Sequence, residues 1–170
     1  MMGTQFIHML GDSSHHQNLL LPAIAGQKIG GICMTEPDSG SDLRSISTKA
    51  EKIKGGYTLT GQKMWVSQAP IADFFTVFAK TGDEGKLTIF LVEAESDGLI
   101  IGRAIEKAGV RGMPTSEVVF DNVFVPCANR LGEEGEGETY LKQILARIRI
   151  ITAALAVGIG QAALDEAKIY

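Results

Sequence analysis

Short runs of apolar or alternating residues fill the middle of the chain, from Lys28 to about Val125. Runs of this kind, bounded by Gly, Pro, Asp or Ser, are typical of strands. They lie at residues 28–35, 47–53, 57–67, 73–80, 87–94, 99–102 and 117–125. Gly55-Gly56 and a polar turn at 81–86 predict two hairpins. The spacing predicts a mainly β fold, an antiparallel barrel or sandwich, and the lack of strand–helix alternation disfavours parallel pairing.

The two ends of the chain have a different pattern. Residues 1–27 read as helical or irregular, and residues 138–170 repeat apolar positions at about 3.6-residue spacing, which predicts one long helix. The apolar stripe is Leu141, Ile144, Leu145, Ile148, Ile151, Leu155, Ile159 and Ala162, and Ile150, Val157 and Leu164 lie off it. A helix that is apolar on several sides needs several neighbours. We therefore expect this helix either to self-associate or to pack against domains that the sequence does not include.

The same helix contains the most apolar window of the chain, residues 144–164, which is long enough to cross a bilayer. Arg147 and Arg149 near one end, Gln161 near the other and many small residues favour burial against other helices instead. The first ten residues have no basic region before an unbroken apolar stretch. No secretory signal and no membrane partner are therefore predicted.

Composition and charge narrow the class further. With 170 residues, 45% hydrophobic and 21% charged, the chain has the composition of one ordinary soluble domain. The net charge of −4 argues against nucleic-acid binding. Cys33 and Cys127 are too few for a disulfide framework, which favours a reducing compartment, the cytoplasm or alternatively the mitochondrial matrix. His15 and His16 are interpreted as solvated rather than as metal ligands, so no metal site is predicted.

Two segments carry candidate chemistry. Residues 34–42, MTEPDSGSD, place hydroxyls, backbone N–H groups and a glycine in one loop after a strand. Such a loop is either a cradle for a polar ring edge or a phosphate, or a plain turn. Residues 61–67, GQKMWVS, carry the only tryptophan of the chain, followed two residues later by a hydroxyl. The ring could stack on a planar ligand, but on the residues alone a tryptophan in the core is the favoured interpretation.

Both segments resemble the two flavin-binding stretches of the acyl-CoA dehydrogenase family, at the separation usual there. The similarity extends through residues 73–81, 107–137 and 158–170 and covers the chain from about Gly11 onward. The resemblance implies the end of an N-terminal helical domain at 1–27, a middle β-barrel domain at 28–131, and the first helix of a C-terminal helical bundle at 132–170. It also implies a dimer or tetramer.

The resemblance further implies FAD as cofactor, an acyl-CoA thioester as substrate, and an electron-transferring flavoprotein as electron acceptor. Thr35 would bond the pyrimidine side of the flavin, Trp65 would flank the ring system, and Ser67 would lie near its reactive nitrogen. The full set expected at the cofactor is Ile32, Cys33, Met34, Thr35, Gly40, Ser41, Trp65, Val66 and Ser67. Ser41 and Arg149 would approach the acyl-CoA.

The catalytic base of the family is a glutamate. In most members it lies far along the C-terminal bundle, and in a minority it directly precedes the helix arginine, a position that Ile148 occupies here. We therefore assign no catalytic residue and expect these 170 residues to be inactive alone. The alternative hypothesis is a non-catalytic flavin-binding or structural module that self-associates through residues 138–170.

Overall fold

The computed structural model describes residues 2–170, which divide into two compact units. The first unit ends at Glu138 and contains the sheet, and the second is Thr139–Tyr170. Over the described residues, eight strands form one sheet in the order β6-β7-β3-β2-β4-β5-β8, with β1 paired to β4 off this path. The strands are β1 Gly30–Cys33, β2 Lys49–Ile53, β3 Gly56–Ser67, β4 Phe74–Thr81, β5 Lys86–Glu93, β6 Leu99–Ile101, β7 Thr115–Pro126 and β8 Arg130–Leu131.

The hairpins predicted from the sequence are confirmed. β2 pairs with β3 in antiparallel fashion from Lys49↔Thr60 to Ile53↔Gly56, and β4 pairs with β5 along its whole length. Gly55 occupies the tight turn of the first hairpin with a φ of 86°, a conformation that favours glycine. The two-residue strand β8 is the one strand in the described part of the chain that sequence patterning missed, because two residues carry no period.

The mainly β fold is confirmed, but two details of the prediction are wrong. The sheet is mixed rather than antiparallel, since β1 runs parallel to β4 from Gly30↔Phe74 to Cys33↔Val77, and β2 meets β4 in parallel at Lys49↔Lys80. The chain returns from β1 to β4 through the β2–β3 hairpin, so the parallel pair needs no crossover helix. The sheet also stays open, because the described strands at its two ends, β6 and β8, do not pair with each other.

β4 pairs with β1, β2 and β5 and is buried on both faces. One face carries Phe75, Val77 and Ala79 into the main hydrophobic core. The other face meets helix α1 (Met2–Leu10), where Phe78 makes an edge-to-face contact with Phe6 at 5.3 Å between ring centroids. Burial on both faces explains why residues 74–79, apart from Thr76, are all apolar instead of alternating with polar residues.

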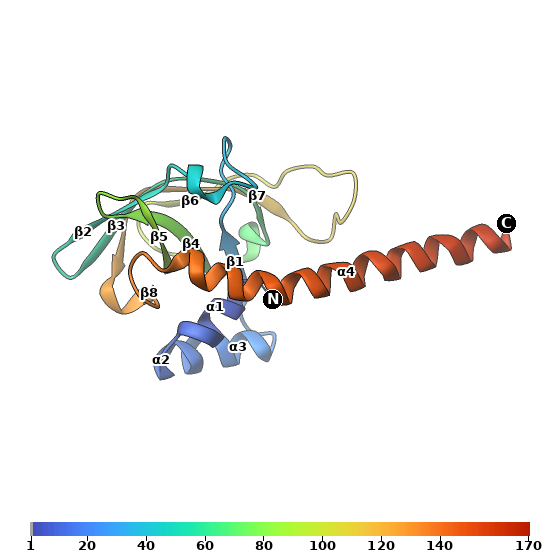
Figure 1. Cartoon of the computed structure of the whole chain (residues 1–170), viewed down its shortest axis with the longest axis horizontal. Helices are drawn as coiled ribbons and strands as arrows, with labels where there is room; N and C mark the ends of the chain where they lie inside the picture. The colour runs from blue at the N-terminus through green and yellow to red at the C-terminus, as the bar shows by residue number, and fades with distance from the viewer. Residues whose placement is uncertain (1) are drawn as a thin grey trace. The chain divides into compact units, whose positions relative to one another are not determined.

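The N-terminal segment is helical, as predicted. After α1 come α2 (Ser13–His15), the π-helix η1 (His16–Leu20) and α3 (Leu21–Ile24), gathered on one side of the sheet next to β1 and β4 (Figure 1). His15 is buried, so its interpretation as a solvated side chain is wrong. Its ring forms a capping box with Asp12, whose carboxylate accepts from the His15 amide at 2.9 Å while the Asp12 amide donates to His15 Nδ1 at 3.2 Å.

The predicted C-terminal helix is also present, as α4 (Gly137–Ile169). Its large apolar side chains Ile150, Ile151, Leu155, Val157, Ile159 and Leu164 are exposed. By length and composition alone, α4 is long and apolar enough to cross a membrane, the one such helix in residues 2–170. Core helices of soluble proteins reach the same length and hydropathy.

Candidate functional site

A cavity of about 400 Å³ opens where the end of β1 meets the end of β3. Its walls come from both sequence segments singled out above, together with α1 and the loop before β7. The lining residues are Gly3, Gly30, Ile32, Met34, Thr35, Met64, Trp65, Ser67, Gln68 and Met113. Two segments about thirty positions apart in the sequence thus form a single site.

The structure brings together five of the residues expected at the cofactor, namely Ile32, Met34, Thr35, Trp65 and Ser67. Cys33 and Val66 are interleaved with them in the sequence but belong to the hydrophobic core. Alternation of side chains along a strand accounts for this, because successive residues point to opposite faces. Gly40 and Ser41 lie in the loop beyond the cavity lining, and Arg149 belongs to the second unit.

A β-bulge in β3 turns Trp65 into the cavity. The pairing with β7 shifts register between Lys63 and Val66, both of which are buried, so Met64 and Trp65 lie between two inward-facing residues. Trp65 has a φ of 60°, an uncommon conformation for a residue with a side chain. Its side chain is 56% exposed, so the interpretation of Trp65 as a core residue is wrong. Bulges often redirect a side chain next to a functional site.

The loop that follows β1 is held by its own polar groups. Glu36 and Ser39 exchange backbone hydrogen bonds of 2.7 and 3.2 Å. The Ser39 hydroxyl donates to the Asp42 carbonyl at 2.6 Å, and the Ser45 hydroxyl donates to Ser39 Oγ at 2.9 Å. These contacts make the loop an ordered turn that joins the cavity wall at Thr35 to β2.

A buried ion pair joins this loop to β3. Glu36 Oε1 lies 2.9 Å from Lys63 Nζ, and the side chains are 3% and 0% exposed. Burial disfavours the charged form of Glu36, but the hydrogen bonds from Lys63, Ser47 and Thr48 outweigh it and lower the pKa of the carboxyl to about 2. Burial lowers the pKa of Lys63, an effect that the carboxylate of Glu36 opposes. Neither residue lines the cavity.

The cavity offers an aromatic face and several hydrogen-bonding groups. Trp65 supplies the face, and Thr35 and Ser67 supply hydroxyls. Gln68 Oε1 is buried without a hydrogen-bond partner among the described residues, and such an acceptor is costly unless a ligand or another group satisfies it. Met34, Met64 and Met113 add apolar, adaptable surface. This set of groups fits a planar heterocycle with polar edges, such as the isoalloxazine ring of a flavin.

Sequence reasoning missed the contributions of Gly3, Gly30, Met64, Gln68 and Met113. Met64 and Gln68 adjoin residues already singled out, so their positions were a usable signal. No sequence signal pointed to Gly3, because its role depends on a tertiary contact. A Cβ at this position would collide with the carbonyl oxygen of Gly31, so glycine lets α1 approach β1 closely. Met113 belongs to the loop before β7, far away in the sequence.

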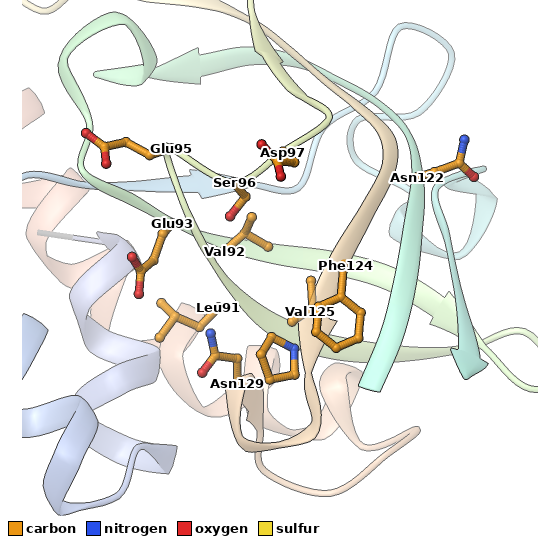
Figure 2. A pocket seen from close by; sticks show the side chains of 11 residues that line it. Leu91, Val92, Glu93, Glu95, Ser96, Asp97, Asn122, Phe124, Val125 and Asn129 are labelled. Atoms are coloured by element: carbon orange, nitrogen blue, oxygen red, sulfur yellow. The ribbon is translucent and has the colours of Figure 1, made fainter. Parts of the chain in front are cut away.

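A second cavity, of about 520 Å³, lies at the end of β5 (Figure 2). The residues that line it include three acidic ones, Glu93, Glu95 and Asp97, together with Phe124. None of the residues expected at the cofactor lines it. Three negative charges around one cavity disfavour a phosphate-bearing ligand, so the smaller cavity is the better candidate for a dinucleotide.

The fold and the site together define a β domain whose cavity combines an aromatic face with hydroxyl groups. The profile of the acyl-CoA dehydrogenase middle domain matches residues 31–123. The chain therefore belongs to the acyl-CoA dehydrogenase family. This match spans the sheet from β1 to β7 and includes both segments that line the cavity.

Individual relatives agree with this assignment. The chain is 56% identical over 171 residues to benzylmalonyl-CoA dehydrogenase of Aromatoleum aromaticum, covering 100% of this chain and 45% of that protein. It superposes on butyryl-CoA dehydrogenase of Megasphaera elsdenii with a TM-score of 0.92 at 36% identity, covering 98% of this chain and 45% of the other. An FAD complex of PigA matches with a TM-score of 0.79 at 33% identity, over 83% of this chain and 38% of PigA. The chain thus spans less than half the length of these relatives.

Proposed function

We propose that this chain is the flavin-binding part of an FAD-dependent acyl-CoA dehydrogenase. The reaction is α,β-dehydrogenation of an acyl-CoA thioester, with the electrons passed on to an electron-transferring flavoprotein. The observation that carries the proposal is the convergence of the two flavin-type segments on one cavity, with Trp65 exposed in it. The FAD complex of PigA, a structural neighbour, supports the choice of cofactor.

The residues of the cavity would hold the isoalloxazine ring in place. Trp65 would flank the ring, the Thr35 hydroxyl would bond its pyrimidine edge, and the Ser67 hydroxyl would lie near its reactive nitrogen. When bound, the flavin supplies the hydride-accepting chemistry, and the protein supplies orientation and polar contacts. Ile32 and Met34 would add side-chain surface, while Cys33 and Val66, which face the core, would contribute through their backbones. Gly40 and Ser41 would contribute from the loop.

Substrate binding involves Ser41 and Arg149 in this proposal. Ser41 would approach the CoA portion, and Arg149 would lie near the acyl-CoA. The similarity to benzylmalonyl-CoA dehydrogenase leads us to propose an acyl group that carries an aromatic substituent. A panel of benzyl-substituted, branched and straight-chain acyl-CoA thioesters, assayed with the enzyme that contains this chain, tests that choice. Preference for a straight-chain substrate would contradict it.

Proton removal needs a general base within reach of the substrate α-carbon. The position before Arg149 is Ile148, which has no titratable group. We therefore propose that the 170 residues bind flavin but do not turn over substrate, and that the base, a glutamate, lies elsewhere in the enzyme. We also propose the domain boundaries 1–27, 28–131 and 132–170, a homodimer or homotetramer, and a cytoplasmic location.

Calorimetric titration of the purified chain with FAD tests the proposal. Saturable binding is expected, and the pair of substitutions Thr35→Val and Ser67→Ala should weaken it about tenfold, since each hydrogen bond contributes about 0.5–1.5 kcal/mol. Thr60→Val serves as a matched control, because Thr60 is exposed on β3 outside the cavity. A chain that binds no FAD but forms a stable oligomer would instead support the structural-module hypothesis.

A further inference from the structure

We propose that Glu36 and Lys63 are positioning residues that hold the two walls of the flavin cavity in register. Thr35 lies on one wall and Trp65 on the other, and each is within two residues of a member of the pair. The inference rests on the proposed function, because it concerns the same cavity. Glu36 and Lys63 do not line the cavity and so would act through the residues they hold.

Lys63 contacts the first wall on both sides of Thr35. Its Nζ donates to Glu36 Oε1 at 2.9 Å and to the carbonyl oxygen of Met34 at 3.1 Å. The amide of Met64, the next residue of β3, donates to the carbonyl oxygen of Thr35 at 2.8 Å. Met34, Thr35 and the adjoining Glu36 are therefore hydrogen-bonded to two consecutive residues of β3, Lys63 and Met64.

Glu36 extends the connection to the chain that leads into β2. One carboxylate oxygen accepts from the Ser47 amide at 2.5 Å and the Ser47 hydroxyl at 2.7 Å. The other accepts from the Thr48 amide at 3.0 Å and the Thr48 hydroxyl at 2.5 Å, in addition to Lys63. With five donors, this carboxylate joins three stretches of backbone at one point.

Packing alone does not require a buried ion pair such as Glu36–Lys63. Two charges removed from water carry a large desolvation cost, and apolar residues of similar volume often give equal stability. What apolar residues cannot supply is the set of fixed directions that these hydrogen bonds impose on Met34, Ser47 and Thr48. Directional bonds next to the bulge are suited to maintaining the distance between Thr35 and Trp65, on which a ring placed between them depends.

The test compares FAD binding by the chain and its Lys63→Met, Glu36→Gln and double variants. We expect each single variant to weaken FAD binding at least tenfold, and the double variant to be no weaker than the more affected single one, because the two residues act as a unit. The absorption spectrum of flavin bound at saturation should also shift, since its surroundings change. Thr48→Val removes one hydroxyl donor to Glu36 and leaves the shape of the side chain almost unchanged. It should weaken FAD binding by about threefold, and it provides the test if the other variants fail to fold.

Two controls separate positioning from general stability. Val123→Ala removes side-chain volume from the core and should lower the free energy of unfolding without changing the dissociation constant for FAD. Lys86→Met breaks the exposed ion pair in which Lys86 Nζ lies 2.7 Å from Glu84 Oε2. It should change neither the free energy of unfolding nor the dissociation constant for FAD. If the wild-type chain binds FAD and the Glu36, Lys63 and Thr48 variants bind it equally well with an unchanged spectrum, the positioning role is wrong. If the wild-type chain binds no FAD, the proposed function fails and this inference with it.

Discussion

Replacing Trp65 by glycine and by alanine separates the backbone of the bulge from the ring it presents. Both changes remove the same ring, so they differ only in how well residue 65 tolerates its φ of 60°. A residue with a Cβ loses roughly 1–2 kcal/mol in this region, whereas glycine loses about 0.5–1 kcal/mol through greater chain entropy. We therefore expect Trp65→Gly to be more stable than Trp65→Ala by about 0.5–1 kcal/mol.

Both variants should lose FAD affinity to the same extent. A planar ring stacked on an aromatic side chain gains about 1–3 kcal/mol, which corresponds to roughly 5- to 150-fold in the dissociation constant. Urea unfolding followed by far-ultraviolet circular dichroism measures stability, and calorimetric titration with FAD measures binding, since the heat of binding can be followed with or without the tryptophan.

Phe124 provides the matched control, because it is 51% exposed at the second cavity and is not among the residues with positive φ. Phe124→Gly should be less stable than Phe124→Ala, the reverse of the order at Trp65, and neither should affect FAD binding. Equal or greater stability of Trp65→Ala would refute the argument from the backbone. Unchanged FAD affinity of both Trp65 variants would refute the argument from stacking.

Three further predictions concern stability and reactivity. Gly3→Ala should lower the free energy of unfolding by about 1–3 kcal/mol, because its Cβ would collide with the backbone of Gly31. Gly109→Ala adds a Cβ in open space and should leave the free energy of unfolding unchanged, a difference that chemical denaturation measures. The pKa of Glu36 is lowered from an ordinary 4.5 to about 2, which contributes up to about 3 kcal/mol to the free energy of unfolding above pH 5. This contribution is lost as the pH falls toward 2. The difference in stability between wild type and Glu36→Gln, measured by urea unfolding, should therefore narrow on acidification. Ellman's reagent should modify only exposed Cys127 in the folded protein and also Cys33 after unfolding, because burial raises the pKa of the Cys33 thiol.

Much of the fold was predictable from local patterns. The hairpin at Gly55-Gly56, the strand runs and the long helix each depend on residues close together in sequence, where periodicity and turn chemistry act. The parallel pairing of β1 with β4 was not predictable in this way, because it joins residues such as Gly30 and Phe74 across an intervening hairpin. Sheet closure depends likewise on distant strands, which explains why the barrel prediction failed while the strand content held.

In the candidate site, too, features set by neighbouring residues were predictable and features set by distant contacts were not. Thr35 and Ser67 were identified from segments that resemble a known family, and the structure places both on one cavity. The family resemblance placed Trp65 beside the flavin, but the pattern of residues 61–67 alone did not predict its exposure. That exposure follows from a bulge that interrupts the alternation of inward and outward side chains along β3. Lys63 reads in sequence as an ordinary strand lysine, and its burial against Glu36 appears only when the loop folds back on β3.

The central claim is that this chain binds FAD at the cavity beside Trp65, and the fluorescence of that residue tests it most directly. Trp65 is the only tryptophan in the sequence, so all tryptophan emission comes from the candidate site. Titration with FAD should quench this emission saturably with a stoichiometry of one FAD per chain. An unchanged emission at FAD concentrations that give visible absorption in the bound fraction would place the cofactor elsewhere, and absence of any bound FAD would contradict the claim altogether.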